Sequence, residues 1–182
     1  MKIYTKTGDA GKTSLYDGTR VDKNTDVIRC LGKIDTLNSV LGCVRENYLR
    51  KGWLDQLKAS LLGLSGWQDV VEEMVVRIQA DLLRIGSHIA TRDPDNRHYQ
   101  ETRFPDGEEA FLEHEIDLLE SVLPPLRVFI KPDNMVHLAR SLCREAELAV
   151  WSLPETDSSV VVYLNRLSDY LFMLGRYISL KH

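Results

Sequence analysis

From residue 26 onward, hydrophobic residues recur three and four positions apart, and this helical spacing limits the fold more than any other feature of the chain. It predicts five amphipathic helices. Their apolar positions are Ile34, Leu37, Leu41, Val44 and Tyr48; Val71, Val75, Ile78, Leu82, Ile85 and Ile89 within residues 68–91; Leu112, Ile116, Leu119 and Leu123 after Asp106; Val136, Ala139, Cys143, Ala146, Val150 and Leu153; and Val161, Leu164, Leu167, Leu171, Leu174 and Ile178. Pro124-Pro125 and Pro154 end the third and fourth helices, because proline cannot donate the helical backbone hydrogen bond. The sequence therefore predicts an all-α fold, a five-helix up-and-down bundle preceded by a short strand or loop.

The remaining segments fit around that bundle. A chain of 182 residues can bury a real core, so we expect one domain over residues 1–182, with a short N-terminal segment (1–26) ahead of the bundle (27–182). Residues 92–105 are polar and predict a surface loop. The apolar segment from Trp53 to Trp67 is ambiguous and is compatible with a short extra helix.

Composition excludes several classes of function. The net charge is −4 and no run of five basic residues occurs, so nucleic acid is not an expected partner. Nothing at the N-terminus resembles a secretory h-region, and no apolar stretch approaches the roughly 20 residues that span a bilayer. We therefore expect a soluble, cytoplasmic protein with no membrane partner. Cys30, Cys43 and Cys143 lack the C-x-x-C spacing of zinc sites, and we expect buried free thiols.

The front loop, residues 4–14, is rich in hydroxyls, lysines and glycines. Glycine lets backbone N–H groups approach an anion closely, and hydroxyl and ammonium groups add donors and charge, so the composition favours a phosphate cradle. Gly11-Lys12-Thr13 matches the second half of a P-loop, but Lys6 stands where the first glycine is required, and a turn follows where a helix is required. An ordinary solvated turn explains the loop equally well when it is taken alone.

Two of the predicted helices carry polar stripes beside their apolar faces. At about 100° per residue, the stripes contain Arg140, Arg144, Glu147 and Trp151 on the fourth helix and Asn165, Asp169, Phe172 and Arg176 on the fifth, whereas Ser141, Glu145 and Ser152 point away. Surface ion pairs, each worth a few tenths of a kcal/mol, account for any one of these residues. The two stripes indicate a wet, charged seam, and their occurrence together with the front loop favours a functional role over isolated surface ion pairs.

Six sequence blocks occur in the order found in one enzyme family. They are Lys2-Ile-Tyr-Thr-Lys-Thr-Gly-Asp9, Arg20-Val-x-Lys23, Asp35-x-Leu-Asn-Ser39, Leu123-Pro-Pro-Leu126 with Phe129-Ile130-x-Pro132, Ala139-Arg-x-x-Cys-Arg-x-Ala-Glu147, and Tyr163-Leu-Asn-Arg-Leu-Ser-Asp169. Over nearly its whole length, the chain resembles the PduO-type ATP:cob(I)alamin adenosyltransferases. The resemblance implies a ferritin-like helical bundle assembled as a homotrimer, with ATP between neighbouring subunits and cobalamin beside it.

The resemblance also implies a reaction and the residues that perform it. The 5′-deoxyadenosyl group of ATP passes to the cobalt of cob(I)alamin, giving adenosylcobalamin and triphosphate, and residues 1–26 form the nucleotide-binding loop. The residues implied around the triphosphate are Thr5, Lys6, Thr7, Gly8, Thr13, Ser14 and Lys23. Those implied to complete the nucleotide site are Arg144, Glu147 and Asn165. Asp35 pairs with Arg140 across the subunit boundary, and Phe129 occupies the lower face of the corrin; with Arg144, these are the implied catalytic residues.

Such chemistry needs no activated side-chain nucleophile, because Co(I) itself attacks carbon, and the sequence shows no Ser-His-Asp or Cys-His signature. The protein has to align cobalt, C5′ and the leaving oxygen and to stabilise charge on the triphosphate, with Mg²⁺ as the implied companion of ATP and its ligands unknown. No D-x-H-x-x-G motif surrounds a histidine, so cobalamin is expected as a passing substrate. A cobalt reductase and an adenosylcobalamin-dependent mutase are the implied partners.

The chain departs from the family pattern at the nucleotide end. Glu145 and Leu148 stand where the usual Arg-Arg-Ala-Glu-Arg has arginines, and residues 133–135 shorten a glycine-rich segment by about five residues. Two alternatives stay open. One is a non-catalytic corrinoid or nucleotide carrier on the same bundle; the other is a small NTPase or phosphotransferase that uses Gly11-Lys12-Thr13.

Overall fold

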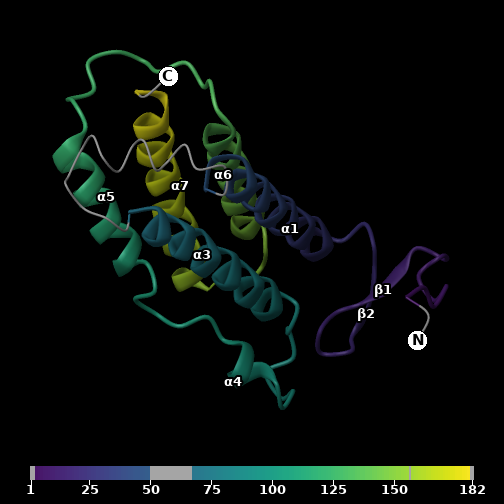
Figure 1. Cartoon of the computed structure of the whole chain (residues 1–182). Coiled ribbons are helices and arrows are strands. Elements are labelled where there is room, and N and C mark those ends of the chain that lie inside the picture. The colour runs from purple at the N-terminus through teal and green to yellow at the C-terminus, as the bar shows by residue number, and fades with distance from the viewer. Residues whose placement is uncertain (1–2, 50–66, 156, 181–182) are drawn as a thin grey trace.

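Among the residues that the structure describes, five long helices form the body of the molecule (Figure 1). The computed structural model describes residues 3–49, 67–155 and 157–180. The long helices are α1 (Asp26–Val44), α3 (Trp67–Ile89), α5 (Ala110–Val122), α6 (Met135–Trp151) and α7 (Ser158–Ser179). A π-helical turn, η1 (Arg45–Leu49), continues α1, and an antiparallel hairpin of β1 (Lys12–Ser14) and β2 (Arg20–Asp22) precedes it. The predicted all-α bundle with a short strand at the front is confirmed.

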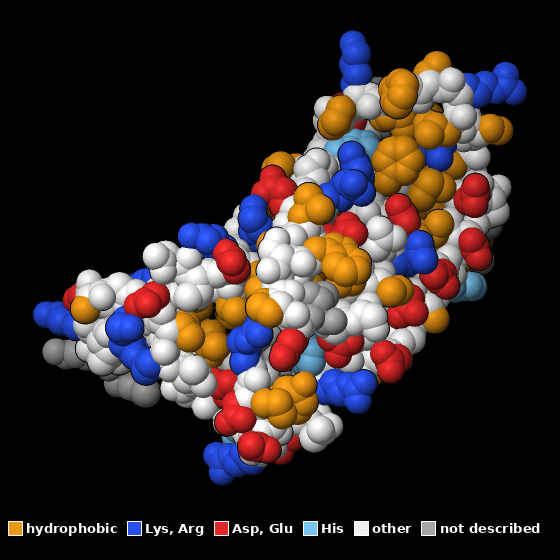
Figure 2. Space-filling model, turned by 180° about the vertical axis from the view of Figure 1, so that it is seen from behind, with side chains coloured by type: hydrophobic (Ala, Val, Ile, Leu, Met, Phe, Trp, Pro, Cys, Tyr) orange, Lys and Arg blue, Asp and Glu red, His pale blue; other side chains and the backbone are white. Residues whose placement is uncertain are grey.

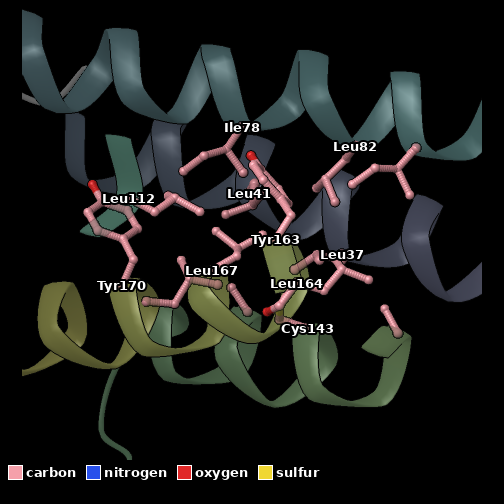
Figure 3. Packing of buried hydrophobic residues seen from close by; sticks show 14 of the residues in the cluster. Leu37, Leu41, Ile78, Leu82, Leu112, Cys143, Tyr163, Leu164, Leu167 and Tyr170 are labelled. Atoms are coloured by element: carbon pink, nitrogen blue, oxygen red, sulfur yellow. The ribbon is translucent and has the colours of Figure 1, made fainter. Parts of the chain in front are cut away.

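The helices enclose one hydrophobic core. Helix α1 packs against α3 and α6, and α7 packs against α6 and α5. Figure 3 shows α1 and α3 on one side of the core and α6 and α7 on the other, with leucines of α1, α3 and α7 and Cys143 of α6 pointing between them. Leu37, Leu41 and Ile78 are fully buried. Each such side chain contributes about 1.5–3 kcal/mol on burial, so this apolar face is what folds the bundle.

Asn134 fixes how α6 lies against α7. Its side-chain oxygen caps α6 by accepting hydrogen bonds from the backbone N–H groups of Val136 and His137. Its Nδ2 donates to the carbonyl of Gly175, at 3.0 Å, and to Oγ of Ser179, at 2.8 Å, near the end of α7. The start of α6 is therefore tied to the end of α7, and the two helices run antiparallel with their polar stripes side by side.

Three expectations from the sequence need correction. Residues 92–105 are not only a polar surface loop: they contain a short helix, α4 (Tyr99–Thr102), and Phe104 is buried, with its ring edge-on to Tyr163 at a centroid distance of 5.1 Å. Helix α5 begins at Ala110 because residues 106–109 form a turn. Cys43 is exposed, unlike Cys30 and Cys143. The ambiguous segment at residues 53–66 lies outside the described residues.

Gly175 permits a close approach between α7 and α6. A Cβ built on it would lie 2.7 Å from Cε1 of the buried His137 ring. We therefore expect Gly175→Ala to push the helices apart and to lower the free energy of unfolding, measured by urea denaturation, by about 1–3 kcal/mol. The matched control is Gly32→Ala on the exposed side of α1, where a Cβ meets nothing within 4 Å and the free energy should stay constant or rise by up to about 1 kcal/mol. Equal destabilisation by both substitutions would contradict this packing.

Candidate functional site

Hydrogen bonds hold the front loop in a defined turn. Arg20 of β2 donates from Nη2 to the carbonyl of Thr7, at 3.0 Å, and from Nη1 to Oγ of Ser14, at 3.4 Å. The hydroxyls of Thr5 and Thr7 lie 2.9 Å apart. Lys6 has φ 60°, a left-handed conformation that non-glycine residues rarely adopt, at a cost of about 1–3 kcal/mol. Strain of this kind concentrates at ligand sites, so it agrees with a binding role for the loop.

The lysines of the hairpin differ in how their charge is compensated. Nζ of Lys12 pairs with Asp22 at 2.9 Å. Nζ of Lys23 instead lies over Gly8, 3.1 Å from where a Cβ of that glycine would be. Within the part of the chain that the structure describes, neither Lys6 nor Lys23 has an ion-pair partner. Their two ammonium groups are therefore available to an external anion.

Asp17 anchors the hairpin to the end of α3. Its carboxylate accepts hydrogen bonds from the backbone N–H groups of Thr19, Arg92 and Asp93, at 2.8, 2.9 and 3.3 Å. Partial burial raises the pKa of Asp17, but these hydrogen bonds outweigh it and hold the pKa below the usual 3.8. Neither Asp17 nor Arg20 was among the site residues predicted from the sequence; the Asp17-Gly18 pair signalled only a turn.

The polar seam, which we define as Arg140, Arg144, Glu147 and Asn165, lies where α6 and α7 run side by side. Nδ2 of Asn165 donates to Oε1 of Glu147 at 3.4 Å, so the two predicted stripes do meet. The guanidinium of Arg140 lies 5.8 Å from the centre of the Phe172 ring. Arg144 is exposed and forms no hydrogen bond or ion pair with any other described residue. The seam thus presents an uncompensated cation beside a carboxylate and an amide.

Two neighbours of the seam serve the fold instead. Arg176 is buried and donates from Nη2 to the carbonyl of Pro124 at 2.6 Å, so it fastens α7 to the loop before α6 rather than standing in a wet stripe. Glu145 points away from the stripe, as predicted, and pairs with Lys33 of α1 at 2.7 Å. The carboxylate of Glu145 is therefore neutralised within its own chain.

The front loop and the polar seam lie apart within one chain. In both whole-molecule views the hairpin projects from the corner of the bundle where α1 begins (Figures 1 and 2). Asp35 lines a groove of about 240 Å³ between α1 and α3, whereas Arg140 lies over α7, so this predicted pair is not formed within the chain. Phe129 is fully exposed in the loop between α5 and α6. One chain therefore provides the predicted residues in separate groups.

Comparison with known proteins identifies the family. The family model for cobalamin adenosyltransferase matches residues 3–178. The chain belongs to this family. It is 37% identical to the corrinoid adenosyltransferase MMAB of Mus musculus over 99% of this chain and 73% of that protein, and 34% identical to the corrinoid adenosyltransferase of Bacillus subtilis over 98% and 87%.

A solved structure agrees with this assignment. It is a variant PduO-type ATP:corrinoid adenosyltransferase from Lactobacillus reuteri, complexed with cobalamin and ATP, which matches with a TM-score of 0.81 and 28% identity over 97% of this chain and 90% of that one. The predicted fold, family and adenosyltransferase activity are confirmed.

The described residues lack two other kinds of feature. They contain no group of three or more His, Cys, Asp or Glu side chains arranged to hold a metal ion. None of the helices that the structure describes is both long and apolar enough to cross a membrane.

We expect Asp17→Ala to loosen the hairpin without unfolding the bundle, because three backbone N–H groups lose their acceptor. Amide hydrogen exchange should become about tenfold faster over residues 12–22 and stay constant in α6 and α7. The pKa of Asp17 is lowered in the folded protein, so its carboxylate stabilises the hairpin at neutral pH. This stabilisation is lost as the pH falls through a value below 3.8. The control is Asp22→Ala, which removes only an exposed ion pair and should have little effect. Equal acceleration in both variants would contradict the anchoring role.

Proposed function

We propose that this chain transfers the 5′-deoxyadenosyl group of ATP to cob(I)alamin at a site built from two copies of the chain. One observation carries the proposal: the front loop and the polar seam both present uncompensated cations, yet they project from different parts of the same molecule. The unpaired cations of the front loop and of the polar seam could bind one anion together. A triphosphate held by the front loop of one copy and the polar seam of the next would meet both groups.

In this proposal, the front loop binds the triphosphate. Lys6 and Lys23 supply positive charge, and the hydroxyls of Thr5 and Thr7, already 2.9 Å apart, supply donors on the same side of the turn. Gly8, Thr13 and Ser14 complete the cradle. Charge-assisted hydrogen bonds of this kind are stronger than neutral ones, and they strengthen further as the leaving triphosphate gains negative charge.

The polar seam would hold the rest of the nucleotide. Arg144 reaches the phosphates, because its guanidinium is exposed and has five donors and no partner among the described residues. Glu147 accepts from the ribose hydroxyls, with Asn165 orienting its carboxylate through their 3.4 Å contact. These contacts align C5′ for attack, which is the main contribution the protein has to make.

A second copy would complete the site through the groove between α1 and α3. That groove is lined by apolar side chains around Asp35, and Leu83 and Val76 of α3 are exposed. Arg140 of the neighbouring copy then pairs with Asp35. This contact joins two different surfaces of the chain, so each copy can bind the next around a closed ring. We propose a ring of three subunits.

Cobalamin would bind beside the nucleotide, against Phe129. A fully exposed aromatic ring can cover a face of the corrin and exclude the axial base. Cobalt(I) then donates an electron pair to C5′, the bond from C5′ to the phosphate oxygen breaks, and triphosphate leaves. Side chains of the protein provide alignment and charge in this step, and none of them becomes covalently bonded.

Mg²⁺ is proposed as a companion of ATP rather than a resident of the chain. The described residues offer no acidic or histidine cluster for it, and Mg²⁺ commonly binds through substrate phosphates with few protein oxygens. The hydroxyls of Thr13 and Ser14 are suitable oxygen ligands. When bound, the ion neutralises charge on the triphosphate. The cytoplasmic location, the cobalt reductase and the mutase partner remain predictions.

Anaerobic incubation of the pure protein with cob(I)alamin and Mg-ATP tests the proposal. We expect cobalt–carbon bond formation, seen in the visible spectrum, with intact triphosphate released. Binding of both substrates without bond formation would favour the carrier, and release of single phosphates would favour the NTPase.

Arg144→Ala should lower kcat/KM for ATP about 30- to 100-fold, the loss expected for a charged hydrogen bond to substrate, with the melting temperature nearly unchanged because Arg144 is exposed. The matched control is Arg29→Ala on α1, an exposed arginine that pairs locally with Asp26. Its kcat/KM should stay within twofold of wild type. A lower melting temperature for Arg144→Ala, with normal activity per folded molecule, would show that Arg144 is structural.

A further inference from the structure

An apolar patch adjoins the polar seam. Trp151 is 60% exposed and Leu148 is 65% exposed on α6, and Val162 is 39% exposed on α7. A large aromatic side chain so open to water is unusual, because tryptophan is mostly buried in folded proteins.

Helix geometry places the patch at one end of the seam. Glu147 and Asn165 are in contact across the antiparallel pair. Trp151 lies one turn after Glu147 on α6, and Val162 lies one turn before Asn165 on α7. Because the helices are antiparallel, Trp151 and Val162 lie at the same level along the pair. Arg144 and Trp151 are seven residues apart on one face of α6, which corresponds to about 10 Å along the helix axis. That spacing is comparable with the reach from the phosphates to the base of an extended nucleotide.

The order of chemistry along this face follows the order of groups in a nucleotide. Arg144 suits a phosphate, Glu147 accepts from ribose hydroxyls, and Trp151 offers a flat apolar surface. Aromatic side chains stack on bases, and the contact is strongest when water is excluded. We infer that the apolar patch is the adenine platform of the nucleotide site, with the Trp151 indole stacked on the base. This inference rests on the proposed function.

A positional argument favours the base over other occupants of the patch. The patch continues directly from the polar seam, and Glu147 forms its boundary. Leu148 precedes Trp151 by three residues on α6, and it is exposed, as Val162 is, so both add apolar surface where a base would displace water.

The test separates the base from the phosphates. Trp151→Ala, Trp151→Phe and the control Leu118→Ala, an exposed leucine of α5, are assayed for KM for ATP at saturating cob(I)alamin and for competitive inhibition by inorganic triphosphate. We expect Trp151→Ala to raise KM for ATP about tenfold with kcat unchanged, within the range for one stacked base. The inhibition constant of triphosphate, which has no base, should stay within twofold of wild type. Trp151→Phe should recover most of the loss, and Leu118→Ala should match wild type.

Three outcomes would overturn the inference. KM for ATP could be unchanged in Trp151→Ala; the inhibition constant of triphosphate could weaken as much as KM; or sedimentation could show that the variant assembles differently, which would make the patch a contact between copies. Absence of turnover and of ATP binding by the wild-type protein would overturn the proposed function itself. Normal turnover by the wild-type protein, together with an unchanged KM for ATP in Trp151→Ala, would overturn only the adenine platform.

Discussion

The antiparallel contact between α6 and α7 is the feature on which the site depends. Asn134 joins the start of one helix to the end of the other, and Gly175 lets His137 pack directly against the backbone of α7. This close packing sets the level at which Glu147 meets Asn165. A shift of one helical turn would separate them by about 5 Å, and the polar seam would no longer exist.

Charge explains why such a seam would bind a polyphosphate. Other charged groups are compensated inside the chain: Lys12 by Asp22 in the hairpin, and Glu145 by Lys33 beside the seam. Lys6, Lys23 and Arg144 have no such partner among the described residues. An exposed cation costs little free energy in water. Its attraction to an anion is strongest when the anion and a second protein surface remove the water around it. In the proposed assembly, binding of ATP and contact between copies therefore strengthen each other.

The sequence predicts the helices well because burial follows local periodicity. Ala139, Cys143 and Ala146 lie one turn apart and are all buried as expected. Phe104 was missed because polar neighbours surround it in the chain, although the space beside Tyr163 decides its burial. Arg176 has the spacing of a seam residue, and only the path of the loop at Pro124 shows that it is buried. Asp17 acts through backbone groups far along the chain, which no local pattern reveals.

Motifs in the sequence predict the residues of both halves of the site. These residues remain a prediction, as does the pairing of Asp35 with Arg140, which involves another copy of the chain. The most direct test is complementation between two variants, each defective in one half. Lys23→Ala damages the front loop and Arg144→Ala damages the polar seam. If neighbouring copies share each site, co-expression in equal amounts should give about a quarter of wild-type activity, because about that share of all interfaces in randomly assembled trimers joins two intact halves. Activity no higher than the mean of the separate variants would contradict a shared site.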